Sequence, residues 1–318
     1  MSSALPLTRP AWQDRLATLP GSPNHIPAFF FAHGSPVLTL SNDSANPNPQ
    51  MRALVQHAGL ESPQANFLRD FGPALLAKYQ PKGILVFSAH WETEGEQLVT
   101  DYGEENPLLM DYFNFSPELY QLKFSSRGDA QLSQRVVELF HEAGIRARLT
   151  SKDEARGRDG RGFEGPGLDH GVFIPFRLMF GEDLRSVPVV QASIDGSLSP
   201  ERNWLLGKAI TKLRGEGILV LSGGLTAHNL QDLTSFTPET ANPLVREFND
   251  AVSSAISLSD PTARKTALIA LTHHKAFRLA HPREDHFVPI YIAAGAGEDG
   301  NVHVLSGFHG SQTVAFGS

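Results

Sequence analysis

Three apolar segments of this 318-residue chain each run directly into a turn that carries a histidine. In chain order, the segments and their histidines are 27–32 with His33, 83–89 with His90, and 217–227 with His228. Continuous apolar runs bounded by turn residues are typical of strands buried on both faces of a parallel sheet. Such sheets bind ligands outside the carboxyl ends of their strands. The sequence therefore predicts three imidazoles at one edge of a sheet, a pattern that indicates a metal site.

Strand-like runs alternate with helical patterns along the rest of the chain. Helices are predicted over 67–79 and 129–143, from 200 to about 213, after the Xaa-Pro pairs at 242 and 260, and near 284–295; shorter strands are predicted over 145–150 and 187–193. This alternation is typical of α/β folds. We expect a single α/β domain, 27–318, with a mostly parallel central sheet flanked by helices on both faces. Residues 1–26 are expected to form a loosely attached N-terminal arm.

Composition limits the partners and the chemistry. The net charge of −7 provides no electrostatic attraction for nucleic acid or for an anionic membrane, so neither is expected as a partner. The absence of cysteine excludes disulfides, thiolate metal ligands and cysteine nucleophiles. No apolar run approaches the ~18 residues of a membrane span, and residues 1–10 lack the apolar core of a signal peptide. We therefore expect a cytoplasmic protein, and its oligomeric state stays open.

Two further histidines occupy positions that favour a functional role. His170 lies in an Asp-His-Gly turn after a glycine-rich loop, 155–167, and His286 follows two acidic residues at the mouth of a short apolar helix. A second loop, 41–49, is rich in turn residues and is expected to cover the crevice. The remaining histidines outside the last motif described below are interpreted as exposed or core residues: His25, His57, His141, His273, His274, His303 and His309.

Seven segments that include these histidines occur in the order found in one known family, and they cover most of residues 27–297. They are His33-Gly-Ser-Pro36, Ser88-Ala-His-Trp91, Asp111-Tyr-Phe-Asn-Phe-Ser-Pro-Glu-Leu-Tyr120, Leu168-Asp-His-Gly171, Pro188-Val-Val-Gln-Ala-Ser-Ile-Asp195, Ala227-His-Asn-Leu230 and His281-Pro-Arg-Glu-Asp-His286. Together they resemble the class III extradiol ring-cleaving dioxygenases, in the branch that is typified by 4,5-DOPA dioxygenase. The family fold, a single α/β domain, agrees with the one predicted above.

The resemblance implies a non-haem metal centre. It makes His33, His90 and His286 the metal ligands, and His228 either an additional ligand or the acid–base residue beside the metal. Fe(II) is the metal expected for activity, and Zn(II) is expected to be able to occupy the same site in the purified protein.

The resemblance also implies a reaction and its substrates. A catechol-type substrate, such as DOPA or protocatechuate, would be cleaved with O2 to a muconic semialdehyde-type product. His228 and His170 would act in catalysis, with His170 lining the substrate site, and His281 is expected to face the same pocket. Residues 27–318 would form the catalytic domain.

Two other kinds of function are compatible with a cluster of histidines. Three histidines and a water molecule are a recognised arrangement in zinc hydrolases. Alternatively, the chain could be a non-catalytic binding protein on the same fold. The sequence contains no dinucleotide or phosphate-binding glycine motif, no Gly-x-Ser-x-Gly elbow and no His-Glu-x-x-His motif.

Overall fold

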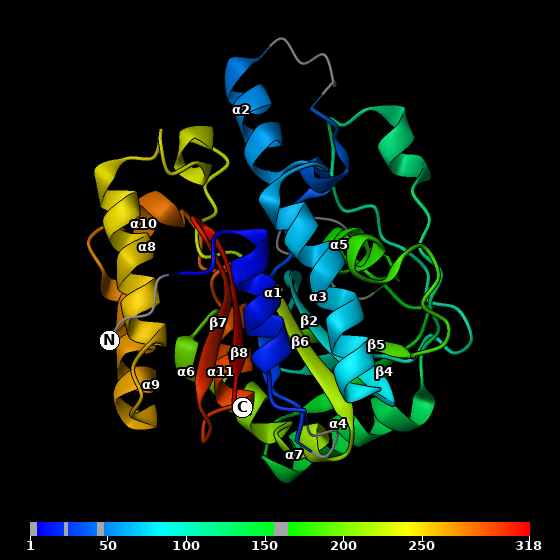
Figure 1. Cartoon of the computed structure of the whole chain (residues 1–318). Coiled ribbons are helices and arrows are strands. Elements are labelled where there is room, and N and C mark those ends of the chain that lie inside the picture. Colours follow the sequence, from blue (N-terminus) through cyan, green and yellow to red (C-terminus); the bar gives the residue numbers. More distant parts are fainter. Residues whose placement is uncertain (1–4, 22–24, 43–47, 156–164) are drawn as a thin grey trace.

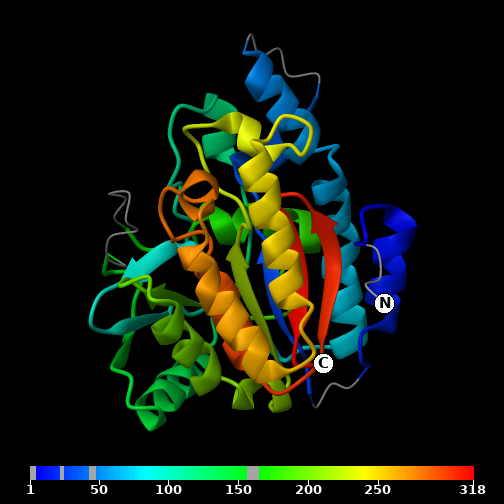
Figure 2. The same ribbon diagram turned by 90° about the vertical axis from the view of Figure 1, so that its left-hand side faces the viewer.

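The computed structural model describes residues 5–21, 25–42, 48–155 and 165–318. Over these ranges, eight strands form one sheet, and helices pack on both of its faces (Figure 1, Figure 2). The predicted α/β class is confirmed. Residues 43–47 and 156–164, which belong to the two predicted loops, lie outside the described residues.

The sheet has the strand order β4-β3-β5-β2-β6-β1-β8-β7. The strands are β1 (Ala28–Ala32), β2 (Gly83–Thr93), β3 (Gln97–Thr100), β4 (Ala147–Thr150), β5 (Val189–Asp195), β6 (Ile218–Gly224), β7 (Val302–Phe308) and β8 (Ser311–Phe316). The four central strands, β5, β2, β6 and β1, are parallel, whereas β8 is antiparallel to β1 and β3 is antiparallel to β5. The carboxyl ends of the central strands therefore share one edge.

Burial on both faces explains the apolar runs of the central strands. Along β2, Leu85 and Phe87 belong to one core, and Ile84 and Val86 belong to the other. The helices are α1 (Arg9–Thr18), α2 (Pro49–Ala58), α3 (Pro63–Tyr79), α4 (Ala130–Glu142), α5 (His170–Phe180), α6 (Pro200–Ala209), α7 (Lys212–Gly215), α8 (Pro243–Ile256), α9 (Pro261–Ala270), α10 (Phe277–Ala280) and α11 (Pro289–Ala296). Residues of α4, α6, α8 and α11 line the first core, and those of α1, α3 and α5 line the second. In the described part of the chain, no helix has the length and apolar character needed to cross a membrane.

Proline and a capping side chain fix the start of several helices. Ser199, Asn242 and Asp260 each accept a hydrogen bond from a backbone N–H of the first turn, and each is followed by proline at the first helical position. These starts agree with the predicted ones. The helix predicted from 200 to about 213 is divided, because α6 ends at Ala209 and α7 begins at Lys212.

The N-terminal segment is more firmly attached than the sequence predicts. Trp12 and Leu16 of α1 are buried in the core that α3 lines, and Asp70 of α3 accepts hydrogen bonds from Arg9 and from the Trp12 indole. Lys78 Nζ donates to the carbonyl of Ala17, in the last turn of α1, and to that of Leu19, just beyond the helix. The expectation of a loose arm was wrong because these contacts come from residues distant in sequence. The division into 1–26 and 27–318 itself stays a prediction.

This packing can be tested through Trp12, whose ring lies edge-on to those of Phe67 and Phe308, with centroid distances of 6.1 and 5.6 Å. We expect Trp12→Ala to lower the free energy of unfolding by about 3–5 kcal/mol, as for other buried aromatic side chains. Urea denaturation measures this change. Leu7→Ala is the control, because Leu7 is 53% exposed. A loss below about 0.5 kcal/mol for Trp12→Ala, the range of surface substitutions, would restore the loose-arm interpretation.

Candidate metal and catalytic site

Five histidines converge at the carboxyl edge of the central strands. His33 directly follows β1, His90 lies near the end of β2, and His228 follows β6. The other two arrive from helix N-termini, since His170 is the first residue of α5 and His286 lies just before α11. Ring contacts link all five into one cluster. The predicted convergence of imidazoles is therefore present.

Three of these rings surround one point. The ring centroids of His33 and His90 are 5.1 Å apart, those of His33 and His286 are 5.3 Å apart, and those of His90 and His286 are 4.9 Å apart. One nitrogen of each ring lies within 4.8 Å of those of the other two, and all three residues are buried. Imidazole nitrogens suit iron, zinc and copper. This donor set fits a single transition-metal ion.

A sharp turn presents His33 at the end of β1. Its backbone N–H donates to the Gly224 carbonyl at 3.2 Å, which continues the pairing of β1 with β6. Gly34 then adopts a φ of +69°, a left-handed conformation that favours glycine. A Cβ at this position would also lie 2.3 Å from a methyl carbon of Leu38. Gly34 of the His-Gly-Ser-Pro motif thus allows the chain to turn immediately after the histidine.

The Asp-His-Gly motif packs directly against His90. A Cβ on Gly171 would lie 2.7 Å from the His90 ring and 2.6 Å from Ser88 Oγ, so only glycine fits. Ser88 accepts a hydrogen bond from the His90 backbone and donates to Asp169 Oδ1 at 2.7 Å. His170 is the first residue of α5, so the predicted Asp-His-Gly turn forms the start of a helix.

His286 is held by a close approach of its backbone to β6. Its carbonyl accepts a hydrogen bond from Leu225 N–H at 2.8 Å, and a Cβ on Gly224 would lie 2.4 Å from that carbonyl oxygen. On the other side, Asp285 Oδ1 accepts a hydrogen bond from the His286 backbone and lies 3.2 Å from His286 Nδ1. Glycine in the strand and an acidic neighbour thus fix the position of this imidazole.

His228 lies beside the three-histidine set. Its ring stacks on that of His286, with centroids 3.5 Å apart and planes 10° apart, and its potential ligand atoms group with those of Asp285 and His286. Burial lowers the pKa of His228 well below its usual range, and the nearby His286 lowers it further. The imidazole of His228 is therefore neutral near pH 7.

Sequence reasoning missed a buried carboxylate between His90 and His170. Asp111 Oδ1 accepts a hydrogen bond from the backbone N–H of His170 at 2.8 Å and lies 2.8 Å from its ring Nδ1, and Asp111 Oδ2 lies 3.2 Å from His90 Nδ1. The residue stands in an irregular segment where periodicity gives no signal. Its position at the head of the Asp111–Tyr120 motif was the available clue.

An ion-paired group beside the cluster was also missed. Arg283 Nη2 lies 2.6 Å from Glu92 Oε2, and Arg283 Nη1 lies 3.5 Å from Asp285 Oδ2. Glu92 comes two residues after His90 on β2, and its side chain is 8% exposed. These contacts tie the segment before α11 to the end of β2.

His281, which belongs to the same motif as His286, lies among aromatic side chains. Its ring packs against those of Phe248, Phe277 and Phe287, with centroid distances of 5.9, 5.3 and 5.2 Å, and the residue is fully buried. Burial lowers the pKa of His281 to about 4. His281 thus packs among aromatic side chains of the core, and its position toward the substrate pocket stays a prediction.

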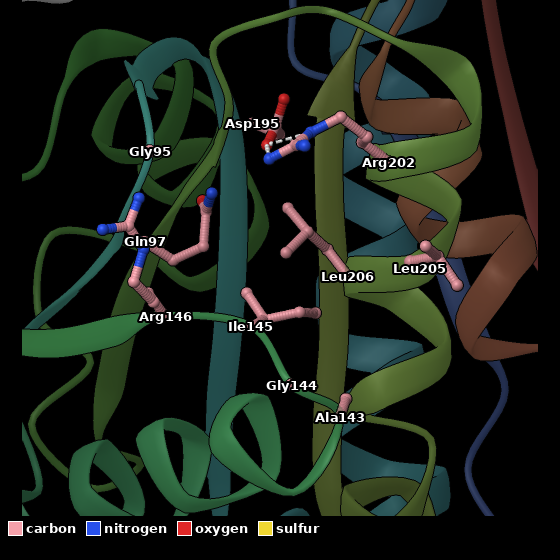
Figure 3. A pocket seen from close by; sticks show the side chains of 10 residues that line it. All are labelled: Gly95, Gln97, Ala143, Gly144, Ile145, Arg146, Asp195, Arg202, Leu205 and Leu206. Atoms are coloured by element: carbon pink, nitrogen blue, oxygen red, sulfur yellow. Dashed lines mark hydrogen bonds and ion pairs between the residues drawn. The ribbon is translucent and has the colours of Figure 1, made fainter.

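A separate pocket of about 530 Å³ lies elsewhere on the surface (Figure 3). It is lined by the segment around Gly144 and Arg146 and by the exposed side of α6, where Arg202 is paired with Asp195 at 2.8 Å. No histidine lines it. This pocket is distinct from the histidine cluster.

Comparison with known proteins identifies the family. Residues 27–316 match the model of the catalytic LigB subunit of aromatic ring-opening dioxygenase. The chain is 37% identical over 306 residues to a 4,5-DOPA dioxygenase extradiol-like protein of Schizosaccharomyces pombe, with 96% of each chain covered. It is 28% identical over 301 residues to 4,5-DOPA dioxygenase extradiol of Beta vulgaris, with 94% of this chain and 97% of the relative covered.

The fold has a match among solved structures. The crystal structure of an uncharacterized protein from Escherichia coli K12 superposes with a TM-score of 0.62 at 23% identity, and covers 92% of this chain and 100% of its own. That likeness concerns the fold alone. The family match over nearly the whole domain and the relative at 37% identity decide the assignment. The chain belongs to the LigB family of extradiol aromatic ring-opening dioxygenases.

Proposed function

We propose that this enzyme opens the ring of a catechol-type substrate with O2, using Fe(II) held by His33, His90 and His286. The observation that carries this proposal is the convergence of the three imidazoles, each with a nitrogen within 4.8 Å of the others. The names of the relatives, 4,5-DOPA dioxygenase extradiol and extradiol-like, support a catechol as substrate. We propose DOPA, protocatechuate or a similar diol, with a muconic semialdehyde-type product.

The donor set suits this chemistry. When bound, Fe(II) supplies a positive centre at which both oxygens of a catechol and O2 can be seated next to each other. Neutral imidazole ligands leave the charge of the ion available to an anionic catecholate. Zn(II) suits the same nitrogen donors and competes for them, so zinc in the purified protein is compatible with the proposal.

His228 is proposed as the acid–base residue rather than as a fourth ligand. Its potential ligand atoms group with those of Asp285 and His286, and not with those of His33 and His90. Burial keeps its imidazole neutral by lowering its pKa. A neutral imidazole accepts the proton that a catechol hydroxyl loses. His170 is proposed as the second catalytic group, with the ring nitrogen opposite Nδ1 directed to a substrate oxygen.

Aromatic side chains next to the cluster support an aromatic substrate. The Tyr112 ring stands perpendicular to that of His170 at a centroid distance of 5.6 Å, and the Phe236 ring lies 6.1 Å from that of His228. Ring edges and faces in this arrangement favour contact with another aromatic ring. A planar diol is therefore a better match than an aliphatic substrate.

The ligand assignment predicts the effect of removing one imidazole. We expect His33→Ala to weaken binding of Fe(II) and of Zn(II) by about 100-fold or more, since even the outer residues that orient ligands change metal affinity by about 10–100-fold. Competition with a chromogenic chelator measures this affinity. His303→Ala on β7 is the matched control and should bind metal like the wild type. Equal metal affinity in the two variants would contradict the assignment of His33.

The assignment of His228 predicts a different outcome. We expect His228→Ala to retain metal but to lose about 10²–10⁴-fold in turnover, the usual contribution of a general acid or base. A panel of catechols is tested after anaerobic loading with Fe(II), and O2 consumption and the yellow ring-opened product are followed together. If the variant loses metal as His33→Ala does, His228 is a ligand instead. If the iron-loaded wild type consumes no O2 with any catechol, the proposed substrate class is wrong.

A further inference from the structure

One carboxylate lies between two histidines to which different roles are assigned above. Asp111 is fully buried, and its two oxygens face different rings: Oδ1 is 2.8 Å from Nδ1 of His170, and Oδ2 is 3.2 Å from Nδ1 of His90. The centroids of these two rings are only 4.0 Å apart. Asp111 thus contacts both a proposed metal ligand and a proposed catalytic group.

These contacts select one tautomer of each imidazole. The backbone N–H of His170 donates to Asp111 Oδ1, which fixes that oxygen as an acceptor. An ionised carboxylate can only accept hydrogen bonds. A ring nitrogen without a proton would point its lone pair at a carboxylate oxygen, and the two would repel each other. A protonated ring nitrogen instead donates a hydrogen bond to that oxygen. Both Nδ1 atoms should therefore carry the proton, which leaves both Nε2 atoms unprotonated.

We propose that Asp111 is a positioning residue that sets the tautomers of His90 and His170 at the same time. In His90 the selected tautomer leaves Nε2 able to bind a metal ion; in His170 it leaves Nε2 able to accept a proton or a hydrogen bond from a substrate oxygen. The roles of the two histidines rest on the proposed function. The tautomers themselves rest only on the three contacts with Asp111.

A second metal ion is the competing explanation of the same geometry. Ligand atoms of His90, Asp111 and His170 also lie within 4.8 Å of one another. The two explanations differ in stoichiometry: a positioning carboxylate gives one ion per chain, and a second site gives two.

Asp111→Asn is the test, because it keeps the shape and removes one acceptor. In this variant, the side-chain amide oxygen should still accept hydrogen bonds from the backbone N–H and the ring Nδ1–H of His170. The amide NH2 group then faces Nδ1 of His90. His90 would then be protonated at Nε2, the nitrogen needed for the metal. We expect this tautomer change in ¹⁵N NMR spectra of the metal-free protein with labelled histidine, together with a loss of metal affinity of about 10–100-fold.

Asp195→Asn is the matched control. Asp195 is also a buried carboxylate, but it is bound to Arg202 and Ser197 beside the surface pocket of Figure 3. Its substitution should leave the histidine tautomers and the metal affinity as in the wild type. Circular dichroism and thermal melting establish that both variants are folded.

Three results would overturn the proposal. The first is an Nε2–H tautomer of either His90 or His170 in the wild type, a measurement that needs no variant and holds even if Asp111→Asn does not fold. The second is a folded Asp111→Asn protein with unchanged tautomers. The third is two metal ions per wild-type chain that fall to one in the variant. None of these readouts depends on ring cleavage, so a failure of the proposed function remains distinguishable.

Discussion

The close approach of three imidazoles at the carboxyl edge of the sheet is the constraint on which the rest of the site depends. Polar groups that are taken from water cost free energy unless they find new contacts. Here the contacts come from carboxylates, with Asp111 against His90 and Asp285 against His286. Glycines make the approach possible, because a Cβ on Gly171 or Gly224 would collide with the cluster. The motifs of this family can thus be understood as packing requirements of one crowded site.

The two hydrophobic cores supply the rigidity that such a site needs. Each central strand is buried on both faces, so the strand ends cannot shift without disturbing α3 and α5 on one side or α6 and α11 on the other. Ligands delivered from different strands and helices are held within a narrow range of positions only on a scaffold of this kind. Even α1 contributes, since Trp12 and Leu16 complete the core under α3.

Features encoded by local patterns were predictable from the sequence, and those that depend on tertiary contacts were not. The strands leading to His33 and His90 are continuous apolar runs, and the helix starts at Pro200, Pro243 and Pro261 carry their own caps. These features need no knowledge of the rest of the fold.

Other features are decided by residues distant in sequence. Asp111 stands in an irregular segment and acquires its place only when the chain brings His90 and His170 together. His281 shares a motif with His286, yet it packs among phenylalanine rings. Spacing alone did not distinguish a core histidine from one in the cluster.

X-ray absorption at the iron K-edge of the Fe(II)-loaded protein tests the central claim most directly, because it reports which atoms bind the metal. We predict an inner shell with the multiple-scattering signature of three imidazoles, and a shell with two in His33→Ala, His90→Ala or His286→Ala. A wild-type shell with one imidazole or none, or with the same imidazole signature after these substitutions, would contradict a metal centre built by His33, His90 and His286.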